Sequence, residues 1–144
     1  MNDPEENERL HKAMKRLATV RDQASRQRMY RQLLRAHFYI PIRPETDGAE
    51  IQSFEQDEPL QGCPVYVAFT QPEQMARWTG KPTSHVVFKG TDLFPILDRG
   101  KIGSLLINPK GTPRGELYRN EVGALADAAP RYQAWLDGRD PTEG

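Results

Sequence analysis

The first 35 residues repeat apolar positions with the period of an α-helix. Two groups of apolar residues are spaced three and four residues apart, so each group lines one helical face. The first group is Leu10, Met14 and Leu17, and the second is Tyr30, Leu33, Leu34 and Phe38. The pattern breaks at residues 18–22. This break predicts two helices with Asp22 as a candidate N-cap of the second, and one continuous helix is the alternative.

The middle of the chain has the patterns of β-strands. Residues 64–70 carry apolar side chains on both faces, which predicts a strand in the centre of a sheet. One face has Val65, Val67 and Phe69, and the other has Tyr66 and Ala68. Residues 51–54 alternate and are the expected hairpin partner of this strand. Further strands are expected at residues 38–42, 85–88 and 104–107, and Pro41 suits an edge position.

Capping residues and apolar spacing predict short helices between the strands. One helix begins after Thr70 or Gln71, and we expect three of its side chains to face the sheet. These side chains are Met75, Ala76 and Trp78. A second helix is expected to begin with Thr91 or Asp92 as its cap and to end at Gly100.

Leu117 and Tyr118 are expected to begin or to precede a last helix that carries Val122, Leu125 and Ala126, and a short piece at residues 132–136 follows Pro130. These elements predict an α+β domain, in which an N-terminal helical segment precedes a mixed sheet of about five strands with short helices packed on it. The 144-residue length fits one domain. We expect that domain to span residues 1–137, followed by a disordered tail at residues 138–144.

Five short segments stand in a defined order along residues 25–125. They are Tyr30-Arg31-Gln32-Leu33-Leu34 leading into Phe38-Tyr39-Ile40-Pro41, then Val67-Ala68-Phe69-Thr70-Gln71-Pro72-Glu73 with Trp78, Gly90-Thr91-Asp92-Leu93-Phe94, Leu106-Ile107-Asn108-Pro109, and Gly115-Glu116-Leu117. In this order the chain resembles the N-terminal domain of the SseB family, named for enhanced serine sensitivity and unrelated to the type III secretion translocon protein of the same name. The resemblance implies a small bacterial cytosolic protein and transfers no catalytic residues.

Charge and cysteine content narrow the possible functions. Twenty Lys and Arg residues balance 20 Asp and Glu residues, so bulk charge does not draw the chain to nucleic acid or to membranes. The N-terminus lacks the apolar segment of a secretory signal, and no stretch approaches the ~20 apolar residues of a membrane-spanning helix. Cys63 is the single cysteine, which excludes an internal disulfide. We therefore expect a cytoplasmic protein without a cofactor or a thiolate zinc site.

Isolated polar residues give weak candidates for chemistry. His11, His37 and His85 lack the paired spacing of metal ligands, so we expect structural or surface roles. Cys63 has no activating neighbour in the sequence. Asp92, Asn108 and Glu116 stand at the ends of expected elements, where caps and turns require such residues.

Arginines supply the candidate binding residues. Arg28, Arg31 and Arg35 fall on one helical stripe and form a candidate contact for a protein partner. The simpler interpretation is a solvated face, or a complement to the acidic residues 45–58, and no nucleic-acid recognition motif is present. Arg114 lies in a polar turn at residues 111–115 that lacks the P-loop pattern, yet it can contact a carboxylate or a phosphate.

These observations favour a non-catalytic, cytosolic module for protein interaction or regulation, whose partner is another protein and whose oligomeric state is open. The alternative is a protein that binds a small molecule or an anion, or an enzyme with an unfamiliar site. A deep pocket with converging polar groups would favour the alternative. A flat apolar patch would favour the interaction module.

Overall fold

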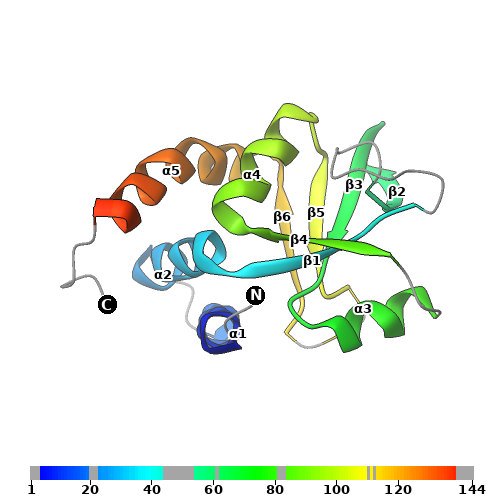
Figure 1. The fold of residues 1–144 in the computed structure, drawn as a ribbon, viewed down its shortest axis with the longest axis horizontal. Coiled ribbons are helices and arrows are strands. Elements are labelled where there is room, and N and C mark those ends of the chain that lie inside the picture. The colour runs from blue at the N-terminus through cyan, green and yellow to red at the C-terminus, as the bar shows by residue number, and fades with distance from the viewer. Residues whose placement is uncertain are drawn as a thin grey trace.

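The computed structural model describes residues 4–19, 23–43, 54–60, 62–80, 84–109, 111 and 113–138. In this part of the chain, five helices and six strands form an α+β fold (Figure 1). The helices are α1 (Pro4–Thr19), α2 (Gln23–Arg35), α3 (Pro72–Thr79), α4 (Gly90–Arg99) and α5 (Arg119–Gly138). The strands are β1 (His37–Pro41), β2 (Gln56–Leu60), β3 (Cys63–Ala68), β4 (His85–Lys89), β5 (Ser104–Ile107) and β6 (Gly115–Tyr118). The predicted class and the two N-terminal helices are confirmed, while Asp22 lies outside the described residues.

The strands form two sheets instead of one sheet of about five strands. The larger sheet has the order β2-β3-β5-β6 and is mixed, because β3 and β5 run parallel while the outer pairs are antiparallel. The smaller sheet pairs β1 with β4. Two backbone hydrogen bonds of 2.7 and 2.9 Å join Tyr39 to Phe69, so the two sheets meet at the end of β3.

The predicted central strand is confirmed, but its predicted hairpin partner is wrong. β3 lies between β2 and β5, and its antiparallel neighbour is Gln56–Leu60. Phe54 instead forms an isolated bridge with Ile42, and residues 51–53 lie outside the described part. β2 is polar, and it can still form a strand because it lies at the edge of the sheet, where charged residues and Pro59 are tolerated.

Both faces of β3 are buried, as its alternation predicts. Tyr66 and Ala68 join the main core with residues of α1, α2, α4 and α5. Val67 and Phe69 form a smaller cluster on the other face with Met75 of α3. The rings of Phe69 and Trp78 lie 5.8 Å apart. The prediction for Ala76 is wrong, because the two-turn helix α3 turns this residue to solvent.

The ends of two helices differ from the sequence predictions. α3 begins after Gln71, which was one of the two expected caps, although the Gln71 side chain makes no capping hydrogen bond. The N-cap of α4 is Lys89, two residues before Thr91 and three before Asp92, the two expected caps. Thr91 and Asp92 therefore lie in the first turn and do not cap it.

Helix α5 is continuous through Pro130, so the predicted break at this proline is wrong. Val122, Leu125 and Ala129 are buried before the exposed proline, and the half-buried Tyr132 packs against the same core after it, so core contacts hold the helix on both sides of Pro130. Gly138, expected in the tail, ends the helix, and residues 139–144 lie outside the described part. Among the described helices, none is long and apolar enough to cross a membrane.

Candidate functional site

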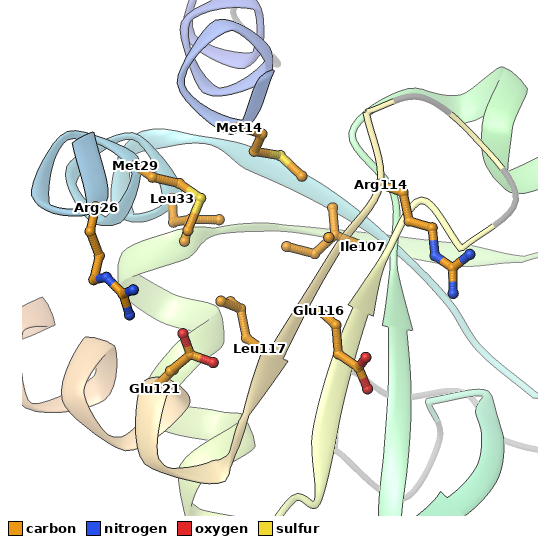
Figure 2. Close-up of a pocket in the computed structure, with 10 residues that line it drawn as sticks. Met14, Arg26, Met29, Leu33, Ile107, Arg114, Glu116, Leu117 and Glu121 are labelled. Carbon is orange, nitrogen blue, oxygen red and sulfur yellow. The ribbon is translucent and has the colours of Figure 1, made fainter. Parts of the chain in front are cut away.

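A hollow of about 300 Å³ opens between the N-terminal helices and strand β6 (Figure 2). Its floor is apolar and its rim is charged. The floor consists of Met14 from α1, Met29 and Leu33 from α2, Ile107 from β5 and Leu117 from β6. The rim consists of Arg26 from α2, Arg114 and Glu116 from the chain at β6, and Glu121 from the start of α5. We call this hollow the β6 groove.

Helix α2 contributes one stripe of side chains to the β6 groove. Arg26, Met29 and Leu33 are spaced by three and four residues, so they share one helical face. Leu33 is buried, Met29 is half-buried and Arg26 is exposed. The stripe thus leads from the core to the surface, and its middle position holds a flexible side chain that adapts to different shapes.

Strand β6 presents its open edge to the β6 groove. It is the last strand in the order β2-β3-β5-β6, so no described strand pairs with its outer side. Neighbouring side chains on a strand point to opposite faces of the sheet. Nevertheless, the successive residues Arg114, Gly115, Glu116 and Leu117 all line the groove. The groove therefore follows the edge of the strand and not one face of the sheet.

Two of the rim charges are held by a network around Tyr30. Glu121 accepts hydrogen bonds from the Tyr30 hydroxyl at 3.2 Å and from the Tyr118 backbone N–H at 3.0 Å. Burial raises the pKa of Tyr30, the Glu121 carboxylate raises it further, and a hydrogen bond with Arg26 opposes the change. Tyr30 thus interacts with both Arg26 and Glu121 and connects these two rim charges.

The remaining two rim charges differ in their partners. Glu116 accepts a hydrogen bond of 3.3 Å from the Tyr118 hydroxyl, and its negative charge raises the pKa of Tyr118. Arg114 is exposed and makes no ion pair or side-chain hydrogen bond with any described residue. The structure thus places the predicted anion contact, Arg114, on the groove rim as a cation whose charge is unmatched there.

The predicted partner contacts Arg28, Arg31 and Arg35 lie elsewhere on α2. Each follows a residue of the groove stripe by two positions, which turns it by about 200° around the helix. Arg28 and Arg31 are exposed, and Arg35 is half-buried. This arginine stripe therefore faces away from the β6 groove, and its role as a partner contact stays a prediction.

A buried polar network lies at the carboxyl ends of the parallel strands β3 and β5. Asn108 accepts a hydrogen bond from the Thr70 N–H at 3.1 Å, and donates to the Thr70 hydroxyl at 3.0 Å and to the Pro113 carbonyl at 2.9 Å. His11 Nε2 lies 2.7 Å from the same hydroxyl. Asn7 donates to the Thr70 carbonyl at 2.9 Å. The network ties α1 to the sheet.

A smaller hollow of about 240 Å³ lies beside this network, and Tyr39 and Glu73 also line it. Burial raises the pKa of Tyr39, and Glu73 raises it further. His11 beside the Thr70 hydroxyl has the spacing of a base and a nucleophile. However, Thr70 is buried and its hydroxyl already accepts a hydrogen bond from Asn108. We therefore interpret the pair as a structural link.

The link through His11 predicts an acid-sensitive fold. Burial lowers the pKa of His11, the Glu8 carboxylate opposes this change, and Lys15 adds to it. As the pH falls, the unfolded chain therefore binds a proton before the folded one does, and the contribution of His11 to stability is lost below about pH 6.5. We expect urea unfolding between pH 7.5 and 5 to show a smaller loss of stability in His11→Gln than in the wild type.

The control for this experiment is Lys12→Gln, which changes an exposed neighbour of His11 on α1. It is expected to retain the pH dependence of the wild type. If His11→Gln has the same pH dependence as the wild type, another group causes the acid sensitivity.

The other candidate residues do not converge on either hollow. Cys63 is half-buried, and Arg119 donates a hydrogen bond of 2.6 Å to its sulfur, a neighbour that the sequence did not indicate. The ring of His85 lies 5.5 Å from that of Tyr39. Across the described ranges, no group of three or more His, Cys, Asp or Glu side chains is placed to hold a metal ion.

Comparisons with known proteins identify the region that contains the site. A family model described as the SseB protein N-terminal domain matches residues 10–124. The match includes every residue of the β6 groove and four members of the polar network, His11, Thr70, Asn108 and Pro113. No curated protein and no solved structure matches the chain.

Proposed function

The chain belongs to the SseB family through its N-terminal domain, and on this premise we propose that it is a non-catalytic protein-interaction module. It binds a segment of another protein in the β6 groove. The proposed setting is the bacterial cytoplasm, in agreement with the resemblance of the sequence to small cytosolic proteins. The module acts by binding and positions no reacting groups.

One observation carries this proposal: an apolar groove follows an open strand edge and has an unmatched cation on its rim. A partner side chain gains free energy when it buries apolar surface on the floor. Met14 and Met29 can adjust to its shape. A carboxylate of the partner pairs with Arg114, which makes the contact selective for a segment with an acidic residue at that position.

The alternative function, binding of a small molecule or an anion, would use the same hollow. Its volume of about 300 Å³ is at the lower end for small-molecule sites, which enclose most of their ligand. The β6 groove instead runs along residues 114–117, which favours an extended segment that continues beyond the hollow.

The proposal predicts that Arg114→Glu weakens partner binding while the fold is retained. The tagged protein is isolated from its native cells, and each copurified protein is quantified by mass spectrometry for the wild type and the variant. We expect the specific partner to fall by about tenfold or more, because attraction becomes repulsion at the rim. The midpoint of thermal unfolding is expected to be unchanged, because exposed charges contribute little to stability.

Arg28→Glu is the matched control, since it reverses an exposed arginine on α2 outside the groove. It is expected to retain the partner, and added salt is expected to weaken the wild-type complex. The contrary outcome is that Arg114→Glu retains the partner fully, while charge reversal of Arg28, Arg31 and Arg35 together abolishes binding. The partner would then bind the arginine stripe and not the β6 groove.

A further inference from the structure

The backbone of Glu116 faces the open edge of β6. The Tyr118 N–H donates to the Glu121 side chain and so points away from β5. Backbone groups two residues apart on a strand point to the same side, so the N–H and C=O of Glu116 also point outward. The hydrogen bonds between β5 and β3 support the same direction. The Asn108 N–H donates to the Ala68 carbonyl of β3, so the backbone groups of Leu106, two residues earlier, also point to β3 and not to the register partner Glu116.

This edge has the properties of a site for an added strand. Beyond its own sheet, Glu116 makes no backbone hydrogen bond with the described residues. Its two outward groups can exchange a pair of hydrogen bonds with one residue of an extended segment. The Glu121 side chain occupies the N–H of Tyr118 at one end, and Met14 lies on the groove face of Gly115, where a side chain at that position would point. The open part of the edge is therefore short.

Successive side chains along the edge point alternately to a charged side and to an apolar side of the strand. Arg114 and Glu116 project to one side of the strand, whereas Leu117 projects toward the floor of the β6 groove (Figure 2). A residue opposite Glu116 on an added strand places its side chain next to that carboxylate. The following residue points to the groove floor, and the residue after it lies next to Arg114.

We infer that the partner segment adds to β6 as a short antiparallel strand and presents a basic, an apolar and an acidic residue in succession. This inference rests on the proposed function and specifies its partner. The basic residue pairs with Glu116, the apolar side chain enters the groove beside Gly115, and the acidic residue pairs with Arg114. The antiparallel direction is chosen because one partner residue then exchanges both hydrogen bonds with Glu116, and because this is the more stable pairing.

The inference is tested with a blocked heptapeptide that has Lys-Leu-Glu at its centre and serine and threonine on both sides. Binding is measured by NMR titration of the ¹⁵N-labelled protein up to millimolar peptide concentration. We expect saturable shifts of the Glu116 and Leu117 amides. A peptide with the reversed centre Glu-Leu-Lys is expected to bind about tenfold more weakly, because both charge pairs become repulsive.

A charge exchange on the protein gives the matched control for the side chains. The double variant Arg114→Glu with Glu116→Lys is expected to prefer Glu-Leu-Lys over Lys-Leu-Glu. Both positions are exposed, so the variant is expected to unfold at the wild-type temperature. An unchanged preference, or the absence of binding by both peptides, would overturn the inference.

N-methylation of the peptide tests the backbone contact separately. A methyl group on the lysine amide removes the hydrogen bond to the Glu116 carbonyl, and we expect binding to be lost. A methyl group on the leucine amide points away from β6 and is expected to be tolerated. Equal effects of the two methyl groups would contradict strand addition. If partner capture still depends on Arg114 in that case, the proposed function stands while this inference fails.

Discussion

Gly90→Ala is expected to destabilise the fold by about 3 kcal/mol or more, because an added methyl group would collide with backbone that cannot move aside. α4 begins at Gly90, where it touches α2. A β-carbon at this position would clash with the Leu33 carbonyl oxygen and lie 2.8 Å from the Leu34 Cα. The measurement is urea unfolding followed by circular dichroism.

Gly123→Ala is the matched control. Gly123 lies inside α5, and its nearest neighbour to an added β-carbon is a side-chain oxygen of Asp98 at 3.4 Å. Alanine there is expected to change the stability by less than about 1 kcal/mol or to increase it, since alanine favours helix. Equal unfolding midpoints for Gly90→Ala and Gly123→Ala would contradict the close contact of α2 with α4.

Asn108→Ala is expected to lower the free energy of unfolding by about 3 kcal/mol. The variant loses three hydrogen bonds and leaves the buried Thr70 N–H and the Pro113 carbonyl without their partner. Asn108 is fully buried with a φ of 51°, a conformation that asparagine tolerates better than alanine. Urea unfolding at pH 7.5 measures the loss.

Two further variants separate the causes. Asn108→Gly accepts the positive φ without strain, so its destabilisation reports the lost side chain and its hydrogen bonds together with the greater freedom of glycine in the unfolded chain, and no backbone strain. Asn120→Ala removes an exposed asparagine at the start of α5 and is expected to change stability by no more than about 0.5 kcal/mol. If Asn108→Ala lowers the free energy of unfolding as little as Asn120→Ala does, the polar network does not contribute to the stability of the sheet.

Local patterns predicted the elements that bury apolar side chains. The alternation of residues 64–70 identified the central strand, because both of its faces are buried. β2 was missed for the opposite reason: an edge strand can carry charged residues and Pro59 without losing core contacts. Pro130 was read as a break, yet the packing of α5 outweighs the loss of one helical hydrogen bond.

The candidate site depends on contacts that local patterns do not contain. The sequence placed Met14 on an apolar helical face and Leu117 near the last expected helix, and only the fold brings them, with Met29, to the floor of an open groove. The spacing of Arg28, Arg31 and Arg35 showed that they share a face, but it did not show which way that face points. Arg114 was identified as a possible anion contact from its turn, and the fold places it on the rim.

The β6 groove as the partner surface is tested most directly by photocrosslinking in native cells. The photoreactive amino acid p-benzoylphenylalanine replaces Tyr118, a ring that is 48% exposed on β6, or, as the comparison, the exposed Arg31 on the opposite side of α2. We expect irradiation to attach one specific protein at position 118 and not at position 31. Introducing Arg114→Glu together with the probe at position 118 is expected to abolish the adduct. A specific adduct at position 31 with none at position 118 would contradict the account.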